Sequence, residues 1–104
     1  MTGRTLTGVG WHFSAAHRSV DDVLHGHTWE VVVWVAGGGD AVALQDRLRA
    51  VLAPLDHGEL PRELIWGEAI AAWIAERMAE TGLDVAQVDV SRAAERIFAR
   101  WIAG

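Results

Sequence analysis

FSAAHRSVDDVLHGHTW, residues 13–29, contains three of the five histidines of this chain. His25 and His27 are separated by one glycine and lead into a Val- and Trp-rich run, 30–36, whose composition predicts a strand. In a strand, residues i and i+2 point to the same face, so both imidazoles can be directed at one point. His17, at the end of the preceding strand, can complete a three-histidine set.

Three neutral imidazoles with one open coordination position are the ligand set of a catalytic zinc site. Imidazole also suits copper, iron and nickel, so Zn²⁺ is the favoured assignment among several metals. An H-x-H pair alone is a weak signal, because such short motifs have many false positives and a histidine is often a structural residue with a satisfied hydrogen bond. The third histidine strengthens the metal hypothesis.

The composition describes one small domain, residues 1–104, in which 51% of the residues are hydrophobic. The formal charge is −5 and all nine basic residues are arginines, which argues against general nucleic-acid binding and excludes Schiff-base catalysis by lysine. There is no cysteine, so neither a disulfide nor a thiol nucleophile is available. We see no long apolar run or signal segment, and we expect a cytoplasmic protein without membrane contact.

Hydrophobic periodicity predicts the order β-β-α-α-β followed by an ambiguous tail. The predicted strands are 5–14, 30–36 and 83–91, and the predicted helices are 40–53 and 67–80. Asp40 is a suitable N-cap for the first helix. Gly8 and Gly10 interrupt the first strand and suggest a β-bulge. The tail, 92–102, has apolar residues at both helical and strand spacing.

Several motifs together resemble the 6-pyruvoyl-tetrahydropterin synthase and 6-carboxy-tetrahydropterin synthase family. F-S-A-A-H followed, after a short loop, by H-G-H-T-W is similar to the histidine segments of the family. L-D-H at 55–57 is similar to the L-D-H motif of the family. Glu68 resembles the acid of a P-T-x-E-N helix start. V-D-V at 88–90, with Ala99 and Trp101, is similar to the last two strands of the family.

The resemblance implies an α+β fold, a four-stranded antiparallel sheet with two helices on one face. This is the ββααββ, tetrahydrobiopterin-synthase-like T-fold, in which the tail is a strand. Family members assemble their sheets into a barrel, commonly as trimers stacked in hexamers. We therefore expect a homo-oligomer with sites near the subunit contacts, since the uncovered sheet face of a monomer would expose apolar side chains.

The resemblance also implies the chemistry. Zn²⁺ held by His17, His25 and His27 would act as a Lewis acid on a substrate oxygen. Asp56 and His57 would move protons, although the pair could also simply cap a loop. We expect Asp56 to act across the loop or a subunit contact, because the side chains of adjacent residues rarely bond to each other.

Two positions differ from the family pattern. Asp21 replaces the usual catalytic cysteine, and it is either a substitute base or part of a solvated acidic turn. Arg92 replaces the glutamate that anchors the pterin ring, and a guanidinium has only donors to offer. Arg92 would suit a carboxylate, phosphate or carbonyl instead. Glu95 could replace that anchor only in a remodelled turn, and Glu68 is expected to contact substrate.

Three functions remain open from the sequence. The first is a zinc-dependent lyase or cyclase whose substrate is a small molecule other than the usual pterin, dihydroneopterin triphosphate. The second is an ordinary pterin synthase in which Asp21 and Glu95 substitute for the missing groups. The third is a non-catalytic metal-binding or structural member of the family.

Overall fold

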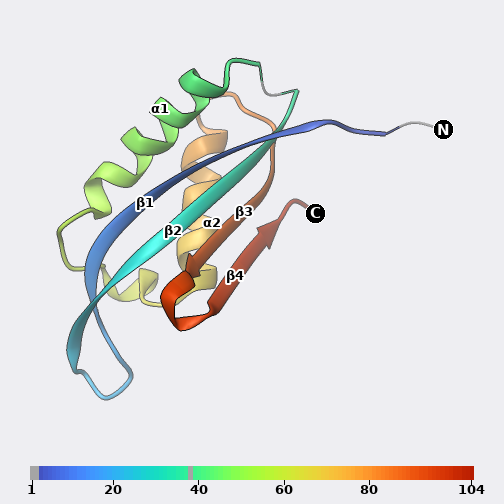
Figure 1. The fold of residues 1–104 in the computed structure, drawn as a ribbon. Helices are drawn as coiled ribbons and strands as arrows, with labels where there is room; N and C mark the ends of the chain where they lie inside the picture. Colours follow the sequence, from blue (N-terminus) through green and yellow to red (C-terminus); the bar gives the residue numbers. More distant parts are fainter. Residues whose placement is uncertain (1–2, 38) are drawn as a thin grey trace.

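The computed structural model describes residues 3–37 and 39–104. In these residues a four-stranded antiparallel sheet, in the order β1-β2-β3-β4, carries both α-helices on one face (Figure 1). The elements are β1 (Leu6–Arg18), β2 (Leu24–Ala36), α1 (Ala41–Leu52), α2 (Gly67–Ala79), β3 (Val85–Arg92) and β4 (Ile97–Ile102). The predicted α+β architecture is confirmed. The three glycines at 37–39 predict a break in the chain after the second strand, and residue 38 lies outside the described residues.

The β1–β2 hairpin is longer than its hydrophobic pattern predicts. The first strand was expected to end at Ser14 and the second to begin at Glu30, but the pairing continues to Arg18 opposite Leu24. Half of the residues in this extension are polar, three of them histidines, and this breaks the apolar alternation by which a strand is recognised. Backbone hydrogen bonds maintain the ladder there, and the extension contains all three candidate ligands.

The ambiguous tail is a strand, as the family resemblance implies. Ile97–Ile102 pairs antiparallel with β3, placing Ala99 opposite Val90 and Trp101 opposite Val88. A short 3-10 turn, Ala93–Glu95, joins the two strands, and Arg96 closes it with φ at 60°. The pairing supplies backbone partners along β3, which the helical alternative could not do.

The expected bulge at Gly8 and Gly10 is wrong, because the β1–β2 register runs unbroken through both glycines. Gly8 instead lies opposite Trp34, and a Cβ there would be 2.7 Å from the indole carbons. The glycine therefore provides room for a tryptophan on the neighbouring strand. The register shift occurs between β2 and β3, at Trp34 and Val35.

The helices cover one face of the sheet and form the core with it. Asp40 caps α1 by accepting hydrogen bonds from two backbone N–H groups, as predicted. The buried residues of the helices pack against alternate strand residues such as Phe13, Val31 and Val33. In the part of the chain that the structure describes, no helix is long and apolar enough to cross a bilayer.

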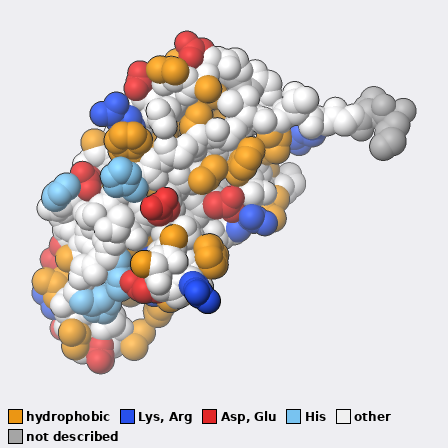
Figure 2. Space-filling model, viewed as in Figure 1, with side chains coloured by type: hydrophobic (Ala, Val, Ile, Leu, Met, Phe, Trp, Pro, Cys, Tyr) orange, Lys and Arg blue, Asp and Glu red, His pale blue; other side chains and the backbone are white. Residues whose placement is uncertain are grey.

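The opposite face of the sheet has no helix over it. Apolar side chains lie there among acidic and basic ones (Figure 2). Asp89 accepts hydrogen bonds from Trp34, Gln87 and Arg100. Burial opposes ionisation of Asp89, but these donors more than offset it and hold its pKa below the ordinary value. This face is thus partly polar and partly apolar, as expected of a surface between subunits.

Candidate metal centre

The paired strands bring His17, His25 and His27 together on the helix-covered face of the sheet. His17 and His25 are direct partners in the β1–β2 register, and His27 follows on the same face. One ligand nitrogen from each ring lies within 4.8 Å of the others. In Figure 2, one group of histidine side chains lies toward the β1–β2 turn, apart from the histidines at the upper left. The predicted convergence of three imidazoles is therefore present.

The donor set fits a divalent metal such as zinc. The Nε2 atoms of His17 and His25 are 3.1 Å apart. Tetrahedral geometry with Zn–N bonds of about 2.05 Å places ligand nitrogens roughly 3.3 Å from one another. The three ligand nitrogens, all within 4.8 Å of one another, are close to that spacing. The three residues could therefore hold a metal with one position left for another ligand.

His17 is oriented by the protein backbone. Its Nδ1 lies 3.0 Å from the carbonyl oxygen of Ile65, so Nδ1–H donates and Nε2 faces the other imidazoles. Burial lowers the pKa of His17 despite this hydrogen bond, and the positive charges of His27, His25 and Arg92 lower it further. A neutral imidazole is the form that coordinates a metal.

His27 is oriented by a carboxylate and also contacted by a guanidinium. Its Nδ1 lies 2.8 Å from Glu95 Oε1, while Arg92 Nη1 lies 2.8 Å from its Nε2. Arg92 Nε is 3.2 Å from Glu95 Oε2, which closes a three-residue ring of contacts. The sequence suggested neither contact, because residues 27, 92 and 95 are adjacent only through the β2–β3 pairing and the turn after β3.

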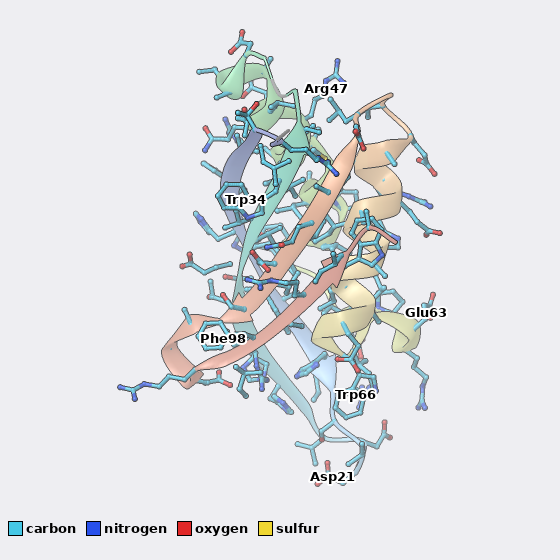
Figure 3. All side chains as sticks on the ribbon, turned by 90° about the vertical axis from the view of Figure 1, so that its right-hand side faces the viewer. Asp21, Trp34, Arg47, Glu63, Trp66 and Phe98 are labelled. Carbon is cyan, nitrogen blue, oxygen red and sulfur yellow. The ribbon has the colours of Figure 1, made fainter. Side chains whose placement is uncertain are left out.

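A cavity of about 510 Å³ opens beside the histidines. His17 and His25 line it together with Glu68 and Arg92, so both predicted substrate-binding residues reach it. Its apolar walls include Trp29, Ile65, Trp66 and Phe98. In Figure 3, Trp66 lies toward the hairpin end of the molecule, whereas the ring of Phe98 projects from β4 on the side away from the helices, so Phe98 lies only at the rim of the cavity. The combination of aromatic walls with a few charged groups is typical of a small-molecule site.

Asp21 lies at the tip of the β1–β2 turn, exposed, and is not among the residues that line this cavity (Figure 3). Ser19 Oγ donates a hydrogen bond to its carboxylate. That bond lowers the pKa of Asp21, with smaller help from backbone N–H groups. The lowered pKa makes Asp21 a weaker proton acceptor within one chain.

Asp56 and His57 lie in a loop along the outer edge of β1. The loop is held there by backbone hydrogen bonds from His57 to Ser14 and from Ala16 to Gly58. The expectation that adjacent side chains would not pair is wrong, since His57 Nδ1 lies 2.9 Å from Asp56 Oδ2. The left-handed backbone of His57, with φ at 59°, accompanies this contact.

His57 lines a second, more open hollow of about 640 Å³ rather than the first cavity. His27, Arg92 and Glu95 line the same hollow. The Ser14 backbone N–H donates to Asp56 and lowers the pKa of its carboxyl, with the His57 contact adding to the effect. Asp56 is therefore an ionised carboxylate suited to hold the His57 ring. The candidate metal centre lies between the two hollows, and Arg92 contacts both.

Comparison with known proteins identifies the family and the fold. The family model for 6-pyruvoyl tetrahydropterin synthase matches residues 9–101. Among solved structures, the 6-pyruvoyl tetrahydropterin synthase of Caenorhabditis elegans superposes with a TM-score of 0.75 at 17% identity, covering 98% of this chain and 97% of the relative. An uncharacterised protein from Wolinella succinogenes superposes with a TM-score of 0.76 at 15% identity, covering 99% of this chain and 100% of the relative.

The 6-pyruvoyl tetrahydropterin synthase of Plasmodium falciparum gives a TM-score of 0.72 at 15% identity, covering 98% of this chain and 100% of the relative. No match was found among curated proteins. At these identities the structural matches establish the fold, which is the predicted T-fold, while the family model matches most of the sequence itself.

Proposed function

Because the chain belongs to the 6-pyruvoyl tetrahydropterin synthase family, we propose that it is a zinc-dependent lyase or cyclase that acts on an anionic small molecule other than the usual pterin. The observation that carries the proposal is the convergence of His17, His25 and His27 beside a cavity that also contains Arg92. When bound there, the metal would supply Lewis-acid activation of a substrate oxygen.

The cavity residues would bind and orient the substrate. Arg92 offers hydrogen-bond donors on a permanent positive charge, which suits a carboxylate or phosphate and not the N–H edge of a pterin. Trp29 and Trp66 provide flat apolar surfaces for a ring. Glu68, in the first turn of α2, supplies an acceptor in the same cavity. These proposed roles rest on the chemistry of each side chain and on its position in the cavity.

Asp56 and His57 would move the proton. The ionised Asp56 carboxylate holds Nδ1–H of His57, which leaves Nε2 as the basic nitrogen. His57 faces the second hollow, which lies on the other side of His27. We propose that substrate or a solvent molecule bridges the two hollows, or that a neighbouring subunit brings His57 to the cavity. Asp21 could contribute as a base only through such a contact.

Two alternatives have less support. As an ordinary pterin synthase the protein would need Glu95 as a ring anchor, but Glu95 is engaged by His27 and Arg92. As a non-catalytic member it would be expected to close the metal site with a fourth protein ligand. Among the described residues only the three histidines form a metal-binding cluster.

The test combines metal content with turnover. His17→Ala and His25→Ala should each lose stoichiometric zinc and all activity, whereas His12→Ala, an exposed histidine outside the site, should keep both. His57→Ala should keep the metal and lose at least about 100-fold in turnover, which is the usual contribution of a general acid–base group. Unchanged turnover in His57→Ala would show that His57 does not transfer the proton.

The substrates offered should include dihydroneopterin triphosphate and related carboxylates and phosphates. Efficient turnover of dihydroneopterin triphosphate would favour the ordinary synthase. Stoichiometric zinc with no turnover of any compound in the series would favour the non-catalytic alternative.

A further inference from the structure

We propose that metal binding strengthens anion binding by Arg92: without the metal Arg92 Nη1 contacts His27 Nε2, and coordination of the metal by that nitrogen frees Arg92 to bind an anion in the cavity. The inference rests on the proposed function, since it requires a metal at the three histidines. It adds a property that the proposed function does not contain, namely positive coupling between metal binding and anion binding.

The first step is that His27 Nε2 cannot accept a hydrogen bond from Arg92 and coordinate a metal at the same time. A neutral imidazole has one nitrogen that donates and one that accepts. Glu95 Oε1, 2.8 Å from Nδ1, takes the donor side, which leaves the single lone pair on Nε2. Arg92 Nη1 occupies that lone pair at 2.8 Å. Arg92 must leave before Nε2 can become a metal ligand.

The second step is that Arg92 can move from His27 to the cavity while it keeps its contact with Glu95. Its Nε stays close to Glu95 Oε2, at 3.2 Å, so the guanidinium can pivot on the carboxylate while Nη1 moves away from His27. Arg92 already lines the aromatic cavity as well as the second hollow. A dication at the histidines would repel the guanidinium, and this repulsion acts in the same direction as the loss of the hydrogen bond.

The third step is that Arg92 is the cationic group best placed to receive an anion there. Arg18 is the other arginine that lines the cavity, and like Arg92 it contacts a carboxylate, with its Nε 3.0 Å from Glu59. Arg92 differs in being less exposed, at 20% against 40% for Arg18. An ion pair formed against the buried Trp29 wall of the cavity is less screened than one in open water.

These three steps predict that metal binding and anion binding strengthen each other. Before metal binding, an anion must compete with His27 for Arg92; afterwards it does not. Coupling energies between sites typically correspond to affinity changes of about 5- to 150-fold. By reciprocity, the anion should tighten metal binding by the same factor.

The experiment uses benzoate as a flat anionic probe and calorimetry on the full chain, with and without one equivalent of Zn²⁺. For the wild type we expect benzoate to bind at least fivefold more tightly with zinc. Arg92→Met, which keeps the length of the side chain but removes its charge and donors, should bind zinc more tightly than the wild type. It should also lose most of the zinc-dependent gain in benzoate affinity.

Arg100→Met is the matched control, because this arginine pairs with Asp89 on the other face of the sheet. It should reproduce the wild-type values. Circular dichroism establishes that each variant is folded. An equal zinc-dependent gain in the wild type and Arg92→Met would overturn the inference, because the gain would then come from the metal alone.

Other outcomes separate the inference from the proposed function. Zinc affinity in Arg92→Met equal to or below that of the wild type would overturn the inference and leave the metal site intact. Failure of wild-type benzoate binding in the presence of zinc would do the same. If the wild type binds no stoichiometric zinc, or if His25→Ala binds it equally well, the proposed function fails and the inference fails with it.

Discussion

The two ring nitrogens of each histidine have different tasks in this site. In His17 and His27 the Nδ1 atom is held by the Ile65 carbonyl and the Glu95 carboxylate respectively. In both rings this leaves Nε2 to face the metal position. The orientation of the ligands therefore depends on two residues that would not themselves contact a metal.

We predict that Glu95→Ala lowers metal affinity by about 10- to 100-fold, the usual effect of removing a hydrogen-bond partner from a metal ligand. The change should be made in the Arg92→Met background, because Glu95 also holds the arginine that competes for His27. Zinc affinity measured by chelator competition is the readout. Glu59→Ala, an exposed acid that pairs with Arg18, is the control. Equal affinities with and without Glu95 would remove it as a positioning residue.

At the scale of elements, the β1–β2 hairpin is the part on which the site depends. Its register places His17 opposite His25, and this register continues to the far end, where Gly8 lies opposite Trp34. A one-residue slip would turn every side chain of a strand to the other face. The close approach of Gly8 to Trp34 therefore helps to fix a register that the metal centre requires.

We predict that Gly8→Ala lowers the free energy of unfolding by about 1–3 kcal/mol, the usual cost of overpacking. The added methyl group would lie 2.7 Å from the Trp34 ring, and the indole would have to move away from Asp89. Urea denaturation followed by tryptophan fluorescence measures the change. Gly3→Ala, where a Cβ meets no atom within 4 Å, should be neutral. Equal stability of both variants would show that the indole is free to move.

At the scale of the whole molecule, the described residues leave one face of the sheet without a helix and leave the β4 edge unpaired. The helices lie on the opposite face, and β4 is an edge strand (Figure 1). Exposed apolar side chains on β4 include Ile97, Phe98 and Ile102, and Ile102 has an exposed fraction of 64%. An unprotected apolar edge strand favours pairing with another chain. Assembly into a trimer or hexamer, as the family resemblance implies, would cover it.

We predict that the wild type is a homo-oligomer and that Ile102→Glu shifts it toward the monomer, because burying an unpaired carboxylate is costly. Sedimentation velocity across a range of concentrations measures the shift. Val42→Glu, which changes an equally apolar residue with an exposed fraction of 69% on α1, should leave assembly unchanged. A monomeric wild type, or equal assembly of both variants, would contradict the prediction.

The sequence by itself determined the order of the first five elements, including both helices, and the placement of His25 and His27 on one face. Each of these follows from neighbours along the chain, through alternation, helical periodicity and the cap at Asp40. The sequence left the tail open, because its apolar residues fit both periods; pairing with β3 decided it. It also missed the extension of the hairpin, residues 15–18 and 24–29. There the strands continue through backbone pairing although their apolar alternation is interrupted.

Only the tertiary structure decided what surrounds the ligands. Residues 27, 92 and 95 become neighbours through the β2–β3 register and the turn that follows β3, and no local pattern specifies either. The same holds for the Ile65 carbonyl on His17, which is a backbone group and has no signature in the amino-acid sequence. Periodicity specifies which face a side chain takes, whereas the partner it meets there depends on chain segments that pack together only in the folded molecule.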